Sequence, residues 1–275
     1  MFISPEEPVC APDHTIEDGW CDLPHSAPDR QRIKHTAMNV YKVVVVMSLS
    51  CSTLALGLGE ARGDALWDKA VALARASEAP YPRAMKEHEK TYDRSGKLKQ
   101  TVISTYAISA LGNQGGRAVL RRSTKDGKDN TSAKRKELKD WGEDGKLLNV
   151  DNLFHPAAQT RVKAQRLSHQ LKIGGVLCVV YDYSHRTSDG LIKGRAYLDA
   201  ASGAPLKTQS RAAKVPVTHG KLKVNSVKST TFYTRYKGQL RVARIAIATD
   251  FEYDGFLFFN FSGVTKTQVT FSDYR

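Results

Sequence analysis

The chain has 275 residues, of which 41% are apolar and 8% aromatic, and its formal net charge is +14 at pH 7. This apolar share supplies a hydrophobic core and excludes a chain that is disordered throughout. The charge is uneven, because residues 1–61 carry −4 and residues 62–275 therefore carry +18. A field of that sign attracts phosphate-bearing partners such as anionic lipid, although a soluble protein with a high isoelectric point would show the same value.

An apolar segment lies near the N-terminus. Lys42–Leu58 contains the run VVVVMSLSCSTLALGL, which is shorter than the roughly 20 residues that a membrane-spanning helix needs. Its length, the preceding lysine and the small residues that follow are typical of a signal peptide. We therefore expect an exported, periplasmic protein with a signal peptide at residues 38–61 and cleavage close to Ala61–Gly63.

The residues before this segment allow two interpretations. Residues 1–37 are rich in Pro, Asp and His and show no apolar periodicity. Either translation starts at Met38 and residues 1–37 are a misassigned start, or they form a disordered tail on an uncleaved anchor. Cys51 raises lipid anchoring as a further alternative, although the preceding Leu49 is one place away from the position that a lipobox requires.

The folded part begins with an amphipathic helix predicted over Asp64–Ala76, with Asp64 as its N-cap and with Pro80 and Pro82 beyond its end. Its apolar stripe consists of Leu66, Trp67, Ala70, Val71 and Ala74. A stripe of this kind must cover an apolar surface. The residues that follow, 85–98, are polar and end in a turn at Arg94–Lys97.

Strand patterns follow. Lys97–Ala110 alternates, with one side formed by Val102, Ser104, Tyr106 and Ile108. Ala118–Thr124 is a second strand, and Asp126-Gly127 is a strong hairpin signal. Residues 125–146 are highly charged and indicate a surface excursion with a short helix around Ser132–Trp141. Its basic group at 134–136 is either a solvated helix face or a phosphate site.

The C-terminal half is almost entirely strand, separated by turns that contain Gly, Asp or Pro. The predicted strands are Leu167–Ile173, Gly175–Ser184, Gly190–Asp199, Pro205–Ala212, Gly220–Tyr236, Leu240–Tyr253 and Phe256–Phe271. Short connections between successive strands predict an antiparallel meander. The fold class is therefore mainly β with some α, a curved antiparallel sheet against which the N-terminal helix lies.

No motif for catalysis, nucleotide binding or metal binding is present. The histidines are scattered, Cys178 lies in an apolar run typical of a buried core residue, and Phe154-His155-Pro156 reads as a turn in which Phe154 anchors to the core. We therefore expect no enzyme, no cofactor and no metal site. An enzyme acting on cell-wall polymer would need a catalytic set that the sequence lacks, and export argues against a nucleic-acid partner.

One stretch resembles a known family. Gly194–Lys207 (GRAYLDAASGAPLK) resembles the strand–turn–strand of outer-membrane lipoprotein-sorting proteins, the Lol carriers with the LolA/LolB-like fold. Tyr197 and Leu198 end the first strand, Asp199 to Gly203 form the turn, and Pro205 begins the second strand. The alternation through Thr230–Tyr236 and Ala243–Tyr253 and the ending Val269–Tyr274 are similar to the last strands of that fold. The resemblance covers about residues 64–275, although the charged insert 125–146 departs from it.

The resemblance implies an incomplete half β-barrel whose concave face is covered by helices, with acyl chains held between them. We accordingly expect a carrier or binding protein for a lipid or for lipoprotein acyl chains, with an anionic membrane surface as a further expected partner. The alternative is a structural or interaction module of the cell envelope whose core is simply filled. The candidate lining residues are aromatic or apolar and come from the predicted helix and strands: Trp67, Tyr106, Leu177, Val179, Tyr181, Phe232, Tyr236, Phe256, Phe258 and Phe261.

Overall fold

The structure is a computed structural model, and it describes residues 64–77, 82–110, 116–140, 147–148, 153–187, 190–215, 222–254 and 260–274. The chain divides into the units Met1–Gln31 and Arg32–Arg275, and all described residues belong to the second. The interpretations of residues 1–37, of the signal peptide and of Cys51 lie outside the described residues. Within them, no helix has the length and apolar character needed to cross a membrane.

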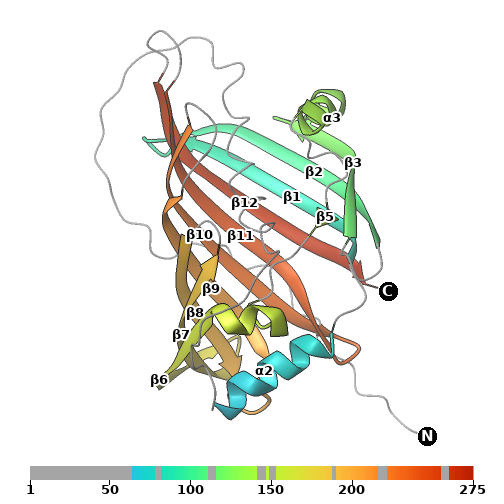
Figure 1. Cartoon of the computed structure of the whole chain (residues 1–275). Helices are drawn as coiled ribbons and strands as arrows, with labels where there is room; N and C mark the ends of the chain where they lie inside the picture. Colours follow the sequence, from blue (N-terminus) through green and yellow to red (C-terminus); the bar gives the residue numbers. More distant parts are fainter. Residues whose placement is uncertain are drawn as a thin grey trace, which may run out of the picture. The chain divides into compact units, whose positions relative to one another are not determined.

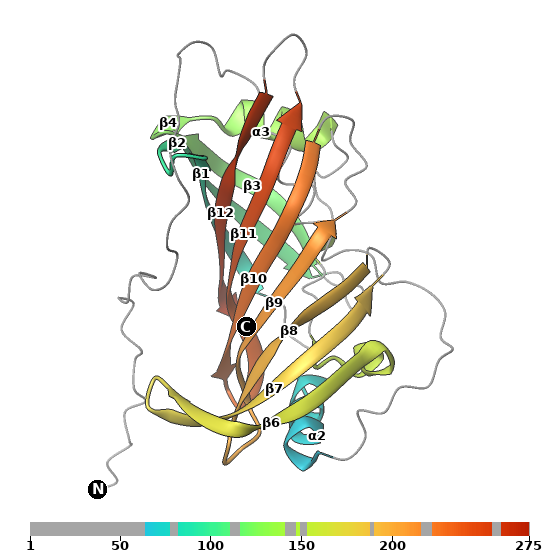
Figure 2. The same ribbon diagram turned by 90° about the vertical axis from the view of Figure 1, so that its left-hand side faces the viewer.

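The described residues form one antiparallel sheet that is not closed (Figures 1 and 2). The strands lie side by side in the order β4-β3-β2-β1-β12-β11-β10-β9-β8-β7-β6, and β5 pairs with β3. Their bounds are β1 Pro82–Asp93, β2 Leu98–Ala110, β3 Gly116–Lys125, β4 Lys128–Asp129, β5 Leu147–Leu148, β6 Val162–Ile173, β7 Val176–Thr187, β8 Gly190–Asp199, β9 Pro205–Val215, β10 Leu222–Tyr236, β11 Gln239–Asp254 and β12 Asn260–Tyr274. The helices are α2 Ala65–Arg75, α3 Thr131–Asp140 and the 3₁₀ helix η3 Pro156–Arg161.

The predicted meander is confirmed, because each strand from β6 to β12 pairs with the next one. The predicted hairpin at Asp126-Gly127 is also confirmed. Both residues have positive φ, 50° and 80°, as a two-residue hairpin turn between β3 and β4 requires. The short helix expected around Ser132–Trp141 is α3, although its Lys134 is buried and forms an ion pair with Glu137 at 3.0 Å.

Residues 85–98 are polar and turn at 94–97 as expected, but most of them form β1, a strand that the sequence did not predict. Glu87, Glu89 and Thr91 alternate along β1 and are all buried, with 6%, 2% and 2% of their surface exposed. A strand is recognised in a sequence by apolar residues on its buried side. Here the buried side is polar, so the usual signal is missing.

Helix α2 begins where predicted. Asp64 is its N-cap, and a side-chain oxygen of Asp64 accepts hydrogen bonds from the amides of Leu66 and Trp67. The helix contacts β8, β11 and η3, whereas α3 contacts β3 (Figure 1). The curved sheet is present, but helices that cover its whole concave face are not confirmed. We call the face that contacts α2 the inner face and the opposite one the outer face.

The turn between β8 and β9 lies directly against α2. Gly203 in this turn has φ +72°, and a Cβ atom at this position would lie 2.9 Å from Lys69 Cβ and 3.0 Å from the Leu66 carbonyl oxygen. Glycine is therefore required twice, for the backbone conformation and for the close approach of the helix. The segment that carries the family resemblance is thus also the segment on which α2 lies.

This double requirement gives a stability prediction. Gly203→Ala should lower the free energy of unfolding by the cost of a positive φ, about 1–2 kcal/mol, and by a further cost of displacing α2. Gly238→Ala is the matched control, because Gly238 also has a positive φ (+76°) but has no neighbouring atom within 4 Å of the added carbon. Equal losses for the two variants in denaturant unfolding would show that the contact with α2 is unimportant.

Candidate ligand-binding site

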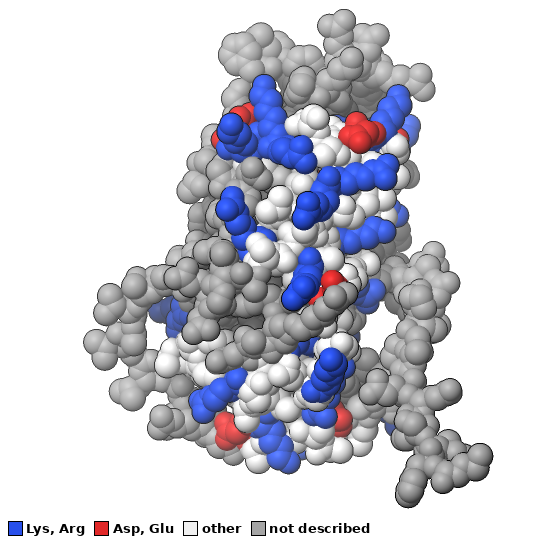
Figure 3. Space-filling view, turned by 90° about the vertical axis from the view of Figure 1, so that its right-hand side faces the viewer, with Lys and Arg blue, Asp and Glu red and all other residues white. Residues whose placement is uncertain are grey.

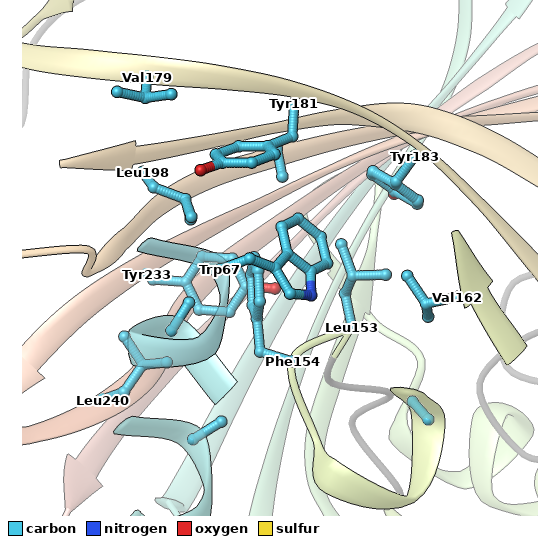
Figure 4. Packing of buried hydrophobic residues seen from close by; sticks show 14 residues of the cluster. Trp67, Leu153, Phe154, Val162, Val179, Tyr181, Tyr183, Leu198, Tyr233 and Leu240 are labelled. Atoms are coloured by element: carbon cyan, nitrogen blue, oxygen red, sulfur yellow. The ribbon is translucent and has the colours of Figure 1, made fainter. Parts of the chain in front are cut away.

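The apolar part of the inner face lies beneath α2 and η3 (Figure 4). Trp67 is at its centre with 2% of its surface exposed. The Trp67 ring centroid lies 5.0 Å from that of Phe154 and 5.3 Å from that of Tyr181, both in tilted geometries that aromatic pairs favour. The cluster also contains Leu153, Val162, Val179, Tyr183, Ala196, Leu198, Tyr233 and Leu240. We call this set, with Trp67, Phe154 and Tyr181, the aromatic cluster.

The buried polar atom of Trp67 is satisfied by η3. Trp67 Nε1 donates to Gln159 Oε1 at 2.9 Å, and Gln159 Nε2 donates to the Leu153 carbonyl oxygen at 2.7 Å. His155 caps η3, since its Nδ1 accepts from the Ala157 amide at 3.2 Å. The predicted turn at 154–156 is therefore confirmed, and Phe154 is fully buried as expected. The segment 153–161 positions both an aromatic ring and a hydrogen-bond acceptor for Trp67.

The N-terminal end of α2 is joined to the sheet by polar groups. The Tyr181 hydroxyl donates to Asp64 Oδ1 at 2.6 Å, and Arg166 Nη1 lies 3.6 Å from Asp64 Oδ2. Partial burial raises the pKa of Asp64, but the bonds from Tyr181, Leu66 and Trp67 and the charge of Arg166 outweigh it, so the pKa is lowered. Burial, together with the Asp64 carboxylate, raises the pKa of Tyr181 well above its usual range.

The C-terminal end of α2 is joined to β11. The Leu240 amide donates to Ser77 Oγ at 2.8 Å, and Arg241 Nη1 donates to the Ser77 carbonyl oxygen at 2.8 Å. Ser77 Oγ in turn donates to the Leu73 carbonyl oxygen in the last turn of the helix. Helix α2 is thus connected by hydrogen bonds to β7 at one end and to β11 at the other.

Further along the sheet the inner face is mixed, because buried polar groups lie there beside buried apolar side chains such as Val102, Leu120 and Phe271. The Tyr106 hydroxyl donates to Glu87 Oε2 at 3.1 Å, and burial together with the Glu87 charge raises the Tyr106 pKa well above its usual range. The hydroxyl groups of Ser104 and Ser123 lie 3.0 Å apart. The remaining buried polar residues on this side are Glu89, Thr91, Thr249, Thr265 and Thr267. The inner face therefore offers apolar contacts under α2 and hydrogen-bonding groups on β1, β2, β11 and β12.

The structure brings some of the predicted lining residues together and separates others. Trp67, Val179 and Tyr181 belong to the aromatic cluster, and Tyr106 lies in the polar part of the inner face. Leu177 is two residues before Val179 on β7, hence on the same side, and 44% of its surface is exposed. Their role in ligand binding stays a prediction.

Two predicted residues lie on the outer face. Phe232 pairs with Arg244 and Lys207 across the sheet and is covered by Arg244, whose guanidinium lies 4.1 Å from the ring centroid. Tyr236 packs beside Tyr274 with 39% of its surface exposed. Neither can line the same space as Trp67. Phe256 and Phe258 lie outside the described residues, and Phe261 is described only as part of the backbone of β12.

The strand β10 contributes Tyr233 to the aromatic cluster, one residue after the predicted Phe232. A register shift between Phe232 and Tyr233 places a β-bulge at this point. The extra residue of the bulge is Ala243 on β11, so Phe232 and Tyr233 keep the ordinary alternation of a strand and lie on opposite faces. The other cluster members that the sequence analysis missed, Tyr183, Leu198 and Leu240, could have been found from alternation with Tyr181 and from their adjoining turns.

Comparison with known proteins gives distant structural neighbours only. No protein-family model and no curated protein matches the sequence. An outer membrane lipoprotein-sorting protein domain from Vibrio parahaemolyticus matches with 12% identity and a TM-score of 0.34, over 76% of this chain and 92% of that one. A DUF1329 family protein from Desulfovibrio piger matches with 9% identity and a TM-score of 0.33, over 77% and 91%. A lipoprotein-sorting domain is thus among the neighbours, as the sequence resemblance predicted, but TM-scores this low carry no argument about function.

The Asp64 contacts give a pH prediction. Because the folded pKa of Asp64 lies below the unfolded one, its stabilising contribution is present above about pH 4 and is lost as the pH falls through the folded pKa. Asp64→Ala should therefore cost about 1–2 kcal/mol near pH 7, and the difference from the wild type should shrink below pH 4. Urea unfolding at several pH values measures it.

The matched control is Asp68→Ala. Asp68 is exposed and lies in the same helical turn, but it does not cap the helix. Its loss should cost only the interaction with the helix dipole, a few tenths of a kcal/mol. A loss for Asp64→Ala that stays constant from pH 7 to pH 3 would contradict the assigned role of the carboxylate.

Proposed function

We propose that this protein is an exported binding protein or carrier for a lipid or acyl chain. The observation that supports it is the inner face, which carries the aromatic cluster under α2 and buried polar groups among apolar side chains on the neighbouring strands. A lipid likewise combines an acyl chain with a polar headgroup. In this proposal residues 38–61 direct export, residues 62–275 form the binding domain, and the ligand is shielded from water between the sheet and α2.

An acyl ligand must take the place of Trp67. Trp67 and its neighbours fill the space between α2 and the sheet, so α2 has to move outward before a chain can lie on Tyr181 and Val179. The helix has 11 residues and is held at its ends by hydrogen bonds to β7 and β11. A short helix with few polar connections is an element that can move without disturbing the sheet.

The energetics are compatible with this exchange. Each buried CH₂ group contributes about 0.8 kcal/mol, so a chain of about sixteen carbons supplies roughly 12 kcal/mol. Micromolar affinity requires about 8 kcal/mol. About 4 kcal/mol is then left, which matches the lower end of the cost of association, so micromolar binding requires that opening of α2 itself costs little.

The second candidate is a structural or interaction module of the cell envelope. Its support is that Trp67 is 2% exposed and contacts Phe154 and Tyr181 directly, as in an ordinary filled core. In that case α2 stays packed on the sheet and does not open. The two candidates differ in whether α2 opens, and this difference can be measured.

The test is a titration with a fluorescent fatty-acid analogue, using protein stripped of lipid and with Trp20 and Trp141 replaced by Phe. We expect saturable binding, on the order of micromolar, with a change in Trp67 emission. Tyr181→Phe removes the hydrogen bond to Asp64, which stabilises the closed position of α2 by about 1–2 kcal/mol. Because α2 then opens more easily, the apparent affinity for the fatty-acid analogue should rise roughly five-fold or more. Replacing Trp67 by a charged residue should weaken both binding and stability.

The matched control is Tyr197→Phe. The Tyr197 hydroxyl donates to Gln209 Oε1 at 2.7 Å on the outer face, so its removal should lower stability without changing ligand affinity. Equal effects of the two Tyr→Phe variants on ligand affinity would mean that α2 does not open. Absence of saturable binding in well-folded protein would reject the carrier and leave the envelope module.

A further inference from the structure

A line of basic side chains crosses the outer face. Residues that pair directly across neighbouring strands point to the same side of the sheet. Lys193 on β8 is opposite Arg211 on β9, which is opposite Lys228 on β10. Beyond Ala248 on β11 the same line continues with Lys266 on β12 and Lys90 on β1. With strands about 4.8 Å apart, five cations lie along roughly 24 Å.

The arrangement is unfavourable for the folded chain on its own. Like charges directly opposite one another destabilise an antiparallel pair, and Arg211 has a cation on each side. Burial and the Arg211 charge lower the pKa of Lys228, and burial together with Lys90 and Lys86 lowers the pKa of His88 on the same face. Both groups therefore lie in a positive field that an anionic partner would relieve.

Few carboxylates compensate this field. Among the described outer-face positions of β7 to β10 the acidic residues are Asp182 and Asp199. Asp182 is paired with Arg195 at 3.0 Å, and Asp199, at the end of β8, accepts hydrogen bonds from Ala201 and Ser202 in the turn. Asp250, on β11, contacts Arg94 at 2.9 Å. Figure 3 shows the side of the molecule opposite to that of Figure 2, and there too Lys and Arg are spread over the described surface with few acidic side chains among them.

An exposed apolar residue lies next to these cations. Leu191 is two residues before Lys193 on β8, pairs with Arg186 on β7, and has 50% of its surface exposed. Cations around an exposed leucine are the composition of a surface that meets lipid headgroups, where the charges contact phosphates and the apolar side chain enters the interface. A soluble polyanion would use the cations but would offer Leu191 no apolar environment.

We propose that the outer face of β7–β10 is a docking surface for an anionic lipid bilayer, through a basic patch formed by Arg186, Lys193, Arg211 and Lys228 around Leu191. This goes beyond the proposed carriage of an acyl chain and does not depend on it. The acyl ligand is assigned to the inner face, whereas the bilayer contacts the opposite one.

The test is co-sedimentation of the full chain with phosphatidylcholine vesicles, either pure or containing about one third phosphatidylglycerol, at two salt concentrations. The wild type should bind the anionic vesicles and release them as salt shortens the Debye length. Each surface cation contributes about five-fold to vesicle partitioning, so Lys193→Gln/Arg211→Gln should bind roughly 25-fold more weakly. Leu191→Ser should weaken vesicle binding about five-fold but leave binding to heparin unchanged.

The matched control is Lys136→Gln/Lys139→Gln, which removes the same charge from exposed positions on α3, beside β3. It should bind vesicles within about two-fold of the wild type. An equal loss for both double variants would reduce the effect to net charge and overturn the proposal. Full vesicle binding by the Leu191→Ser variant would also overturn the proposal, because the patch would then fit a soluble polyanion. The same variants are also titrated with the fatty-acid analogue in the absence of vesicles, so that a loss of vesicle binding can be distinguished from a loss of acyl-chain binding.

The patch also has a stability readout. Arg211→Gln relieves two like-charge contacts, so the free protein should unfold at a slightly higher urea concentration while it loses vesicle binding. A variant that loses both stability and vesicle binding would indicate that Arg211 supports the fold, and the docking role would be rejected.

Discussion

The pairing of β1 with β12 is the constraint on which the rest of the sheet depends. It runs from Pro82↔Tyr274 to Asp93↔Gly263 and joins two local meanders, β1–β4 and β6–β12, into one sheet. The inner face changes character here, since Glu89 is opposite Thr267 and the hydroxyl groups of Thr91 and Thr265 lie 3.3 Å apart. Because the two strands are far apart in sequence, Glu89 and Thr91 of β1 meet the threonine side chains of β12 only when both ends of the domain have come together.

The parts of the fold that could be predicted are those that local patterns encode. Alternation and turn residues indicated β2 and β7 to β12 within a few residues, and Asp64 marked the start of α2. The strand β1 could not be recognised, because Glu87, Glu89 and Thr91 occupy its buried side. The β1–β12 pairing has no local signal at all, since it depends on which edges remain free after the two meanders have formed.

The residues of the candidate site also divide into those that a local sequence pattern predicts and those that it does not. Trp67, Val179 and Tyr181 could be grouped from the sequence, because a helix stripe and a regular strand have a fixed period. Phe232 and Tyr233 alternate regularly on β10, but the sequence did not indicate which of the two faces α2, because both are aromatic. Phe154 was recognisable as a core anchor from its Pro-containing turn, but its contact with Trp67 depends on η3, which brings residues 153–161 back over the sheet.

The side chains on the two faces of β7–β10 have opposite effects on the stability of the sheet. On the outside, opposed cations cost up to about 1 kcal/mol for each directly paired set. On the inside, each large aromatic ring of the cluster buries some 150–250 Å², which at about 25 cal/mol per Å² contributes several kcal/mol. The cluster around Trp67 therefore outweighs the repulsion between Lys193, Arg211 and Lys228 and keeps the strands in register. Opening of α2 would remove part of that stabilisation, because Trp67 packs directly on Tyr181 of β7.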